Sequence, residues 1–539
     1  MKLSLKKRLL LATLSGILLA ISFPAVGGVG PLALLALVPL LLLEEDLFQN
    51  KDRSYKIYFY SFLTFFLYNL ITVWWIWFAS EGGAIMAVVA NSIVMVLPIA
   101  AFHVTKKFVG VKEGYIGLFF YWLGFEYMHY HWELSWPWLN FGNMFANHHY
   151  LVQWYSYSGV LGGTMWILLV NMLFYLIAKN VFFKKESWNI QTPLLVLQAI
   201  LILFPVISSL IIYYNYEEEG DELNVLIIQP NIDPYQKFSS ITPDQQIDKI
   251  IHLVEQKMDE SVDLIIAPET ALPMSINEDG IEKNGFILRI SQKLEEWNGP
   301  DLLIGSSTHL YFDHKNSYAS RNLGNGVWLE AYNSALLISR NKPIQIYHKS
   351  QLVLGVERLP FPAIFENMAI DMGGTTGTLG AEEKPFCLKS KGMEITPCIC
   401  YESVYGGYVA EFSRLGSDFI AIMTNDGWWK DTPGYKQHLN FARLRAIENR
   451  KFITRSANTG ISAILNSRGD VLEKTGWWED AVIKGTIRLS DQETFYVKYG
   501  DVIGRVSGFT AVLILIFAIF KWLRSFGSVF KKEQNAGVE

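Results

Sequence analysis

Long apolar segments separated by short polar loops fill the first 215 residues of the chain, and one more lies close to its C-terminus. A helix needs roughly 20 apolar residues to cross a bilayer, so segments of this kind predict transmembrane helices. We expect eight, of which the second and fifth have the least certain ends: 9–26, 31–43, 57–79, 84–104, 115–127, 159–178, 193–213 and 507–520.

The first apolar segment follows four basic residues, Lys2, Lys6, Lys7 and Arg8, which is also the pattern of a secretory signal peptide. The stretch that begins at Pro24 lacks a small-x-small cleavage site, and another apolar run starts at once. We therefore interpret this segment as a retained first helix.

The pattern changes at about residue 223, where charges become more frequent and short β-rich runs alternate with amphipathic windows. Strands are expected at 224–229, 263–267, 301–305, 334–339, 395–400 and 418–424, and helices at 243–260 and 435–449. Alternating strands and helices predict an α/β sandwich, to which 461–466 adds antiparallel pairing. The predicted parts are a membrane domain (1–215), an extracytoplasmic catalytic domain (220–490), an eighth helix (503–524) and a cytoplasmic tail (525–539).

Composition and charge agree with this division. The chain of 539 residues is 51% hydrophobic, and its mean hydropathy of +0.20 is high for a soluble protein. A net charge of -5 without a basic tract gives no reason to expect a nucleic-acid partner. Three cysteines exclude a disulfide framework, and we interpret Cys387 and Cys398 as structural.

Basic residues orient the predicted helices, because Lys and Arg accumulate in cytoplasmic loops. With the N-terminus inside, the inside loops hold nine basic residues and the outside loops hold none; the nine are Lys51, Arg53, Lys56, Lys106, Lys107, Lys112, Lys179, Lys184 and Lys185. Both termini are then cytoplasmic, and the chain from about Tyr214 to the last helix is extracytoplasmic. Apart from Glu126 and His103, we expect almost no ionisable residues within the spans.

The outside connection 129–158 contains a Trp- and Pro-rich stretch at 132–143. Aromatic residues gather at bilayer interfaces, so we interpret the stretch as an interfacial belt, with direct contact to a substrate as the alternative.

Candidate chemistry lies just beyond three of the predicted strands. Cys400 ends one strand within Thr-Pro-Cys-Ile-Cys-Tyr-Glu-Ser, Glu269 follows another, and Lys349 a third. A thiol with a pKa of about 8.5 needs a base to remove its proton and a cation to favour the thiolate. Cys400 is thus the predicted nucleophile, Glu269 the base, and Lys349 the cation beside the oxyanion. Taken singly, Cys400 is more often a buried core thiol, and Glu269 and Lys349 are more often surface charges; only their combination indicates catalysis.

These three residues, in this order, resemble the catalytic triad of the nitrilase (carbon-nitrogen hydrolase) superfamily. Eight apolar segments with such a domain between the seventh and the eighth resemble the apolipoprotein N-acyltransferase family. The motifs Tyr-Asn333-Ser, Cys400-Tyr-Glu, Asn425-Asp-Gly-Trp and Gln437-His support this resemblance over nearly the whole chain.

The resemblance implies an αββα sandwich attached to a polytopic helical membrane domain in the bacterial inner membrane, with the catalytic domain on the periplasmic side. It implies a ping-pong reaction without cofactor or metal: Cys400 takes an acyl chain from a phospholipid, typically phosphatidylethanolamine, and passes it to the amine of a lipoprotein's diacylglyceryl-cysteine. It also implies supporting roles for Glu357, Tyr401 and Glu402.

Substrate contacts are expected from Phe238, Asn333 and Trp428. The chain departs from the family at three places: Ala267 replaces the Trp of Trp-Pro-Glu, Phe238 replaces a Trp, and Leu354-Gly-Val-Glu357 replaces Pro-Phe-Gly-Glu. These departures affect the expected shape of the acyl pocket.

Two other classes of protein compete with this interpretation. A membrane-tethered amidase or nitrile hydrolase would share the triad but needs only one span. A transporter or receptor with an inactive ligand-binding domain would share the spans, but intramembrane charges are scarce and all three triad residues are retained.

Overall fold

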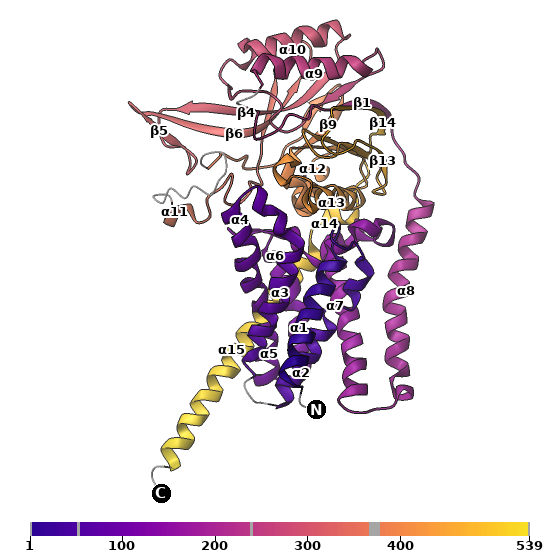
Figure 1. Ribbon diagram of the computed structural model, residues 1–539, viewed down its shortest axis with the longest axis vertical. Coiled ribbons are helices and arrows are strands. Elements are labelled where there is room, and N and C mark those ends of the chain that lie inside the picture. The colour runs from indigo at the N-terminus through magenta and orange to yellow at the C-terminus, as the bar shows by residue number, and fades with distance from the viewer. Residues whose placement is uncertain (1–2, 51–53, 238–240, 366–377, 537–539) are drawn as a thin grey trace.

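The computed structural model describes residues 3–50, 54–237, 241–365 and 378–536. It consists of a helical bundle and an α/β domain that sits on one end of it (Figure 1). The bundle helices are α1 Leu5–Ser22, α2 Val38–Asn50, α3 Lys56–Val73, α4 Glu81–Ile85, α5 Asn91–Phe108, α6 Val111–Met128, α7 Tyr155–Phe182, α8 Thr192–Asn215 and α15 Val502–Ala536.

A helix covers at least part of each of the eight predicted segments, which confirms a polytopic helical membrane domain. Within the described part of the chain, five stretches are long and apolar enough to cross a bilayer: Lys56–Phe78, Glu81–Phe108, Tyr155–Phe182, Trp188–Asn215 and Val502–Ser525. The number of eight crossings therefore stays a prediction. The bounds expected for the second segment are wrong, because a 3-10 helix, η1 Gly30–Leu34, precedes a separate α2 that begins only at Val38.

The bundle contains more buried charge than we expected. Glu44 and Glu45 in the middle of α2 face Lys106 of α5, whose Nζ lies 2.5 Å from Glu44 Oε2 and 2.7 Å from Glu45 Oε2. His103 Nδ1 is 2.8 Å from Glu44 Oε1. Lys106 is thus not a solvated loop residue, because its charge is buried and paired with α2, the helix that Figure 1 shows at the end of the bundle away from the α/β domain.

The α/β domain contains two facing sheets. The first has the order β14-β1-β2-β4-β6-β5, with β3 beside β4 and β7 beside β6; the second has the order β13-β12-β11-β10-β9-β8. The first sheet consists of β1 Glu222–Gln229, β2 Leu264–Ile266, β3 Ile276–Asn277, β4 Asp301–Phe312, β5 Arg321–Gly324, β6 Val327–Ile338, β7 Gln345–His348 and β14 Ala481–Arg488. The second consists of β8 Leu388–Ser390, β9 Met393–Ile399, β10 Phe419–Thr424, β11 Ile453–Ala457, β12 Ala463–Leu465 and β13 Val471–Lys474.

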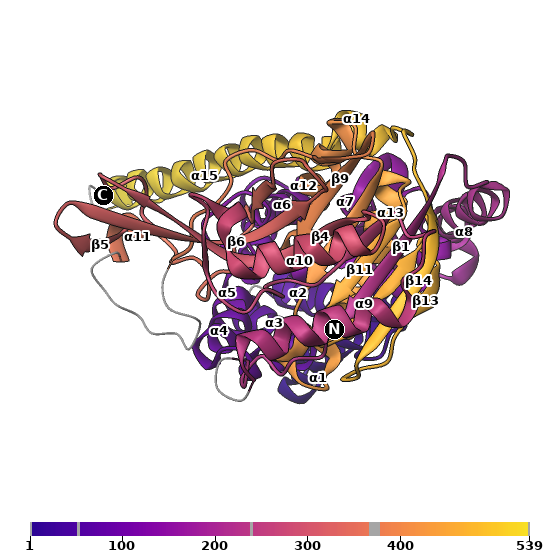
Figure 2. The same cartoon turned by 90° about the horizontal axis from the view of Figure 1, so that it is seen from above.

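Helices cover the outer face of each sheet, as Figures 1 and 2 show. Helices α9 Pro243–Lys257 and α10 Gly285–Glu296 cover the first sheet, and α12 Gly406–Arg414 and α13 Pro433–Asn449 cover the second. Shorter helices are α11 Pro362–Phe365 and α14 Phe495–Tyr499. The period-two pattern of β1 explains the layering, because Val225 and Ile227 point between the sheets while Leu226 and Ile228 pack under α9 and α10. The predicted αββα sandwich is confirmed.

Helix α13 joins the two parts of the molecule, since it packs against α7 and against η5 Phe141–Leu151 of the outside connection. Glu448 accepts a hydrogen bond from the backbone N–H of Val160 in α7 at 2.9 Å and pairs with Arg445 at 2.7 Å. Arg445 in turn donates to the carbonyl of Val404, which belongs to the short helix that follows β9. Contacts between buried polar groups therefore connect the membrane helices to the C-terminal end of β9.

Candidate active site

Cys400 occupies a sharp turn at the end of β9. The strand stops at Ile399, and Cys400 begins the 3-10 helix η8 Cys400–Val404 with a φ of +52°. A residue with a Cβ rarely adopts this left-handed conformation, and such residues cluster at functional sites. The turn brings the thiol to the rim of the second sheet, where Cys400 is 9% exposed and lines a cavity. Cys398, two residues earlier on β9, packs into the core beneath α12 and α13.

Glu269 reaches the same place from the first sheet. It follows β2, and the turn that carries it packs directly on Gly305 of β4. A Cβ at position 305 would lie 2.6 Å from the Cα of Glu269 and 2.5 Å from the carbonyl oxygen of Pro268, so only glycine fits. This close approach fixes the backbone of Glu269 against the sheet.

Lys349, one residue beyond β7, lies between two carboxylates. Its Nζ is 2.9 Å from Glu357 Oε1 and 3.4 Å from Glu269 Oε1, and its side chain is 1% exposed. Asn333 of β6 donates from Nδ2 to both carboxylates, at 2.8 Å to Glu269 and 3.2 Å to Glu357. The structure thus brings together Glu269, Asn333, and the pair Lys349 and Glu357, which come from three segments of the chain.

The charges of this cluster act on Cys400. Burial raises the pKa of the Cys400 thiol well above its usual value, the Glu269 carboxylate raises it further, and Lys349 opposes both. Burial alone would lower the pKa of Lys349, but Glu357 and Glu269 outweigh it and hold that pKa above its usual range. The site therefore combines a protonated thiol, a fixed cation and a neighbouring carboxylate, so a reaction through this sulfur requires the thiol to lose its proton.

Glu402 links the Cys400 turn to the Lys349 loop. Its Oε2 accepts from the N–H of Ile399 at 2.8 Å, and its Oε1 accepts from the N–H of Ser350 at 2.7 Å and from the hydroxyl of Tyr347 at 2.8 Å. Glu402 is fully buried. One carboxylate consequently fixes the positions of Cys400 and Lys349 relative to each other.

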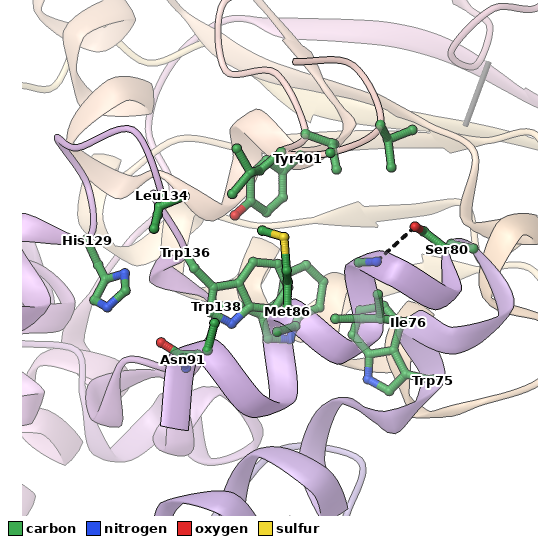
Figure 3. Close-up of a pocket in the computed structure, with 18 of the residues that line it drawn as sticks. Trp75, Ile76, Ser80, Met86, Asn91, His129, Leu134, Trp136, Trp138 and Tyr401 are labelled. Carbon is green, nitrogen blue, oxygen red and sulfur yellow. Dashed lines mark hydrogen bonds between the residues drawn. The ribbon is translucent and has the colours of Figure 1, made fainter. Parts of the chain in front are cut away.

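An apolar cavity extends from Cys400 between the α/β domain and the bundle (Figure 3). Tyr401 lies above Trp136 and Trp138 and is roughly parallel to both, with interplanar angles of 25° and 14°. The cavity is also lined by Trp132 and by Val353. The Trp-rich outside connection therefore lines the same cavity as Cys400. This position supports direct contact with a substrate, the alternative, over the interfacial belt that we expected.

Neither Asn333 nor Trp428, the two expected substrate contacts that the structure describes, lines this cavity. Trp429 lines it, whereas Trp428 does not: the Trp428 ring packs against Tyr235, and its carbonyl accepts from the Tyr235 hydroxyl. Asn333 lies behind the two carboxylates, as described above. Phe238 lies outside the described residues.

Two buried side chains near the site, Lys237 and His438, were not predicted from the sequence as part of it. Lys237 is buried and donates to the carbonyl of Thr270, the residue after Glu269; burial lowers the pKa of Lys237 to about 8, while the Glu269 charge opposes that shift. His438 Nε2 is 3.1 Å from the Cys400 carbonyl oxygen, and its Nδ1 is 3.0 Å from Asp426. No periodicity distinguishes Lys237 from a surface lysine, whereas the Gln437-His438 motif signalled His438 without giving its role.

Comparisons with known proteins agree with these observations. Residues 225–495 match the carbon-nitrogen hydrolase family, and residues 15–173 match the apolipoprotein N-acyltransferase N-terminal domain. An apolipoprotein N-acyltransferase of Chlorobaculum tepidum is 32% identical over 96% of this chain and 98% of its own length, and one of Geobacter metallireducens is 26% identical over 94% and 95%. Among solved structures, an amidase from a Nesterenkonia species covers 52% of this chain and 94% of its own at 15% identity, with a TM-score of 0.35.

Proposed function

The chain belongs to the apolipoprotein N-acyltransferase family, and from this premise we propose how its residues move an acyl chain from a phospholipid to the amine of a lipoprotein. The protein is a membrane-embedded acyltransferase with a nitrilase-like domain. The observation that carries the mechanism is that Cys400 lies in a strained turn which opens into an apolar cavity shared with the membrane helices.

In the first half-reaction, Glu269 removes the proton of the Cys400 thiol as sulfur attacks the ester carbonyl of the donor. The carbonyl electrons move to oxygen, and the resulting oxyanion lies beside Lys349, whose charge stabilises it in a dry site. When the intermediate collapses, the C–O bond breaks and the leaving alkoxide takes the proton from Glu269. The products are a Cys400 thioester and a lysophospholipid.

In the second half-reaction, the amine of the diacylglyceryl-cysteine attacks the thioester carbonyl. Glu269 now accepts a proton from nitrogen, Lys349 again faces the oxyanion, and the breaking C–S bond releases Cys400, which regains the proton. One carboxylate thus serves both steps as acid and base. Glu357 and Asn333 hold Lys349 and Glu269 in place, which supports positioning roles for both.

Glu402 positions the nucleophile through its bonds to Ile399 and Ser350, and Tyr401 forms part of the cavity wall. We propose that the acyl chain occupies the cavity and that phosphatidylethanolamine is the donor. An alkyl chain forms no hydrogen bonds, so it fits a cavity whose walls include Trp, Val, Ala and Met side chains.

The distribution of Lys and Arg along the chain supports an orientation in which the bundle end with Lys106 faces the cytoplasm of a bacterial inner membrane. The α/β domain and Cys400 then lie on the periplasmic side, between a seventh and an eighth helix. Residues 1–215, 220–490 and 503–524 are the membrane domain, the catalytic domain and the last helix.

The test separates acyl transfer from hydrolysis. Purified protein in phospholipid vesicles receives a diacylglyceryl peptide with a free N-terminus, and the products are analysed by mass spectrometry. Transfer gives an amide-linked third acyl chain and an equal amount of lysophospholipid, and an N-acetylated peptide stays unmodified. Release of free fatty acid or hydrolysis of simple amides instead would favour the tethered amidase.

A further inference from the structure

One face of a single helical rod forms a wall of the cavity. Helix α4, the π-helical η3 Met86–Ala90 and α5 run on without a break, and the residues that line the cavity recur at every third or fourth position. They are Ser80, Gly83, Met86, Ala87, Ala90, Asn91 and Val94. The residues between them point away, since Ile85, Val89 and Ile93 are 56%, 37% and 55% exposed.

This lining face leads from the α/β domain into the bundle. Helix α4 lies next to the α/β domain, and α5 continues toward the opposite end (Figure 1). With a rise of 1.5 Å per residue, Gly83 and Val94 are separated by about 16 Å along the rod. The face therefore offers the cavity a long wall with its deepest lining residues at Asn91 and Val94.

The character of the wall changes along its length. Gly83, Ala87 and Ala90 are small and leave space, whereas Asn91 is held rigidly at the deep end. Asn91 Nδ2 donates to Oδ1 of Asn69 in α3 at 2.8 Å, and Asn69 Nδ2 donates to the Phe65 carbonyl at 2.8 Å. Both amides are almost fully buried. A methyl group that reaches this pair meets two hydrogen-bonded amides instead of apolar side chains. Extending the chain past them would bury no further apolar surface against an apolar wall.

We infer that this helical face sets the length of the acyl chain that the enzyme transfers. The inference rests on the function proposed above: the ester carbonyl of the donor phospholipid lies at Cys400, its chain runs along the face, and its terminal methyl group reaches the layer of Ala90, Asn91 and Val94. Side-chain size in that layer determines the longest chain accepted.

The experiment uses the full-length protein in detergent with an equal mixture of phosphatidylethanolamines that carry myristoyl, palmitoyl or stearoyl chains. The readout is the chain-length distribution of the thioester on Cys400 by intact mass. Ala90→Phe fills the deep end and should shift the distribution toward shorter chains. Each methylene held in an apolar cavity is worth about a fourfold preference, so excluding two methylenes changes the ratio about fifteenfold. Val94→Ala enlarges the same layer and should shift the distribution toward longer chains.

Val89→Phe is the matched control, because it adds the same ring to the exposed side of the same helical turn and should leave the distribution unchanged. An unchanged distribution in both Ala90→Phe and Val94→Ala overturns the inference, as does an equal loss of all three chains in Ala90→Phe with no shift in Val94→Ala. These outcomes differ from a failure of the proposed function, in which the unmodified protein forms no thioester with any chain.

Discussion

Replacing Lys349 by Met tests the electrostatic design of the site. The side chain of Lys349 is 1% exposed, and its Nζ lies 2.9 Å and 3.4 Å from the carboxylates of Glu357 and Glu269. In so dry a site, the loss of one donor to an oxyanion costs about 2.7–4 kcal/mol, or on the order of a hundredfold to a thousandfold in rate. Because an oxyanion forms in both half-reactions, Lys349→Met should slow both.

The same substitution leaves two buried carboxylates without their cation. Breaking a buried ion pair typically costs about 3–5 kcal/mol, so we expect the variant to unfold at a lower temperature as well. If a proton binds to Glu269 to relieve the repulsion, the base is lost as well, and the loss of rate approaches the thousandfold end of the range. Rates must therefore be expressed per folded molecule, with the folded fraction measured by size-exclusion chromatography.

A double variant separates charge balance from catalysis. Lys349→Met combined with Glu357→Gln removes one of the two unpaired carboxylates and should recover part of the stability, but it should not recover the rate of thioester formation. Lys237→Met is the matched control, since it also removes a buried cation near Glu269 but leaves the Lys349 cluster intact, and it should lose less rate than Lys349→Met. Recovery of the normal rate in the double variant would refute an oxyanion role for Lys349.

Two further predictions concern single buried carboxylates, and a third concerns the orientation of the chain in the membrane. Glu402→Gln should reduce thioester formation at least tenfold, measured by intact mass, because its amide group would face the N–H of Ile399 or the donors on the Lys349 loop and leave one unpaired. Asp426 Oδ2 lies 2.6 Å from Nη2 of Arg455. Burial alone would raise the pKa of Asp426, but Arg455 and His438 lower it from 3.8 to about 2. About 2 kcal/mol of stability is therefore present above pH 4 and lost as the pH falls through 2, and Asp426→Asn should lose it already at pH 7 in thermal unfolding. A reporter active only outside the cytoplasm should function when fused near Glu219 and fail near Lys532, and the reverse pattern would overturn the orientation.

Much of the α/β domain could be predicted from the sequence, because its strands and helices carry strong periodicity. Short motifs at the ends of strands predicted the strand before Cys400 and singled out Glu269 and Lys349, which the structure places side by side. Ion pairing across the bundle could not be predicted, since Lys106 meets Glu44 and Glu45 only after α2 and α5 pack together.

The cavity could not be predicted from the sequence at all. Its walls come from the α4–α5 rod, the outside connection, the Lys349 loop and the Cys400 turn, which are far apart in the chain. Trp428 was expected to face the substrate, but one step along a 3-10 helix turns the side chain by about 120°, and Trp429 faces the cavity instead. Such rotations depend on the fold and leave no periodic signal.

The most direct test of the account is the mass of the intact protein after incubation with phospholipid alone. The account predicts an increase by one acyl group, located on Cys400 by peptide mapping, removed by hydroxylamine and discharged when a diacylglyceryl peptide with a free amine is added. Cys387→Ser and Cys398→Ser should retain the adduct, and Cys400→Ser should lose it. An adduct on another residue, or normal acyl transfer by Cys400→Ser, would contradict the account.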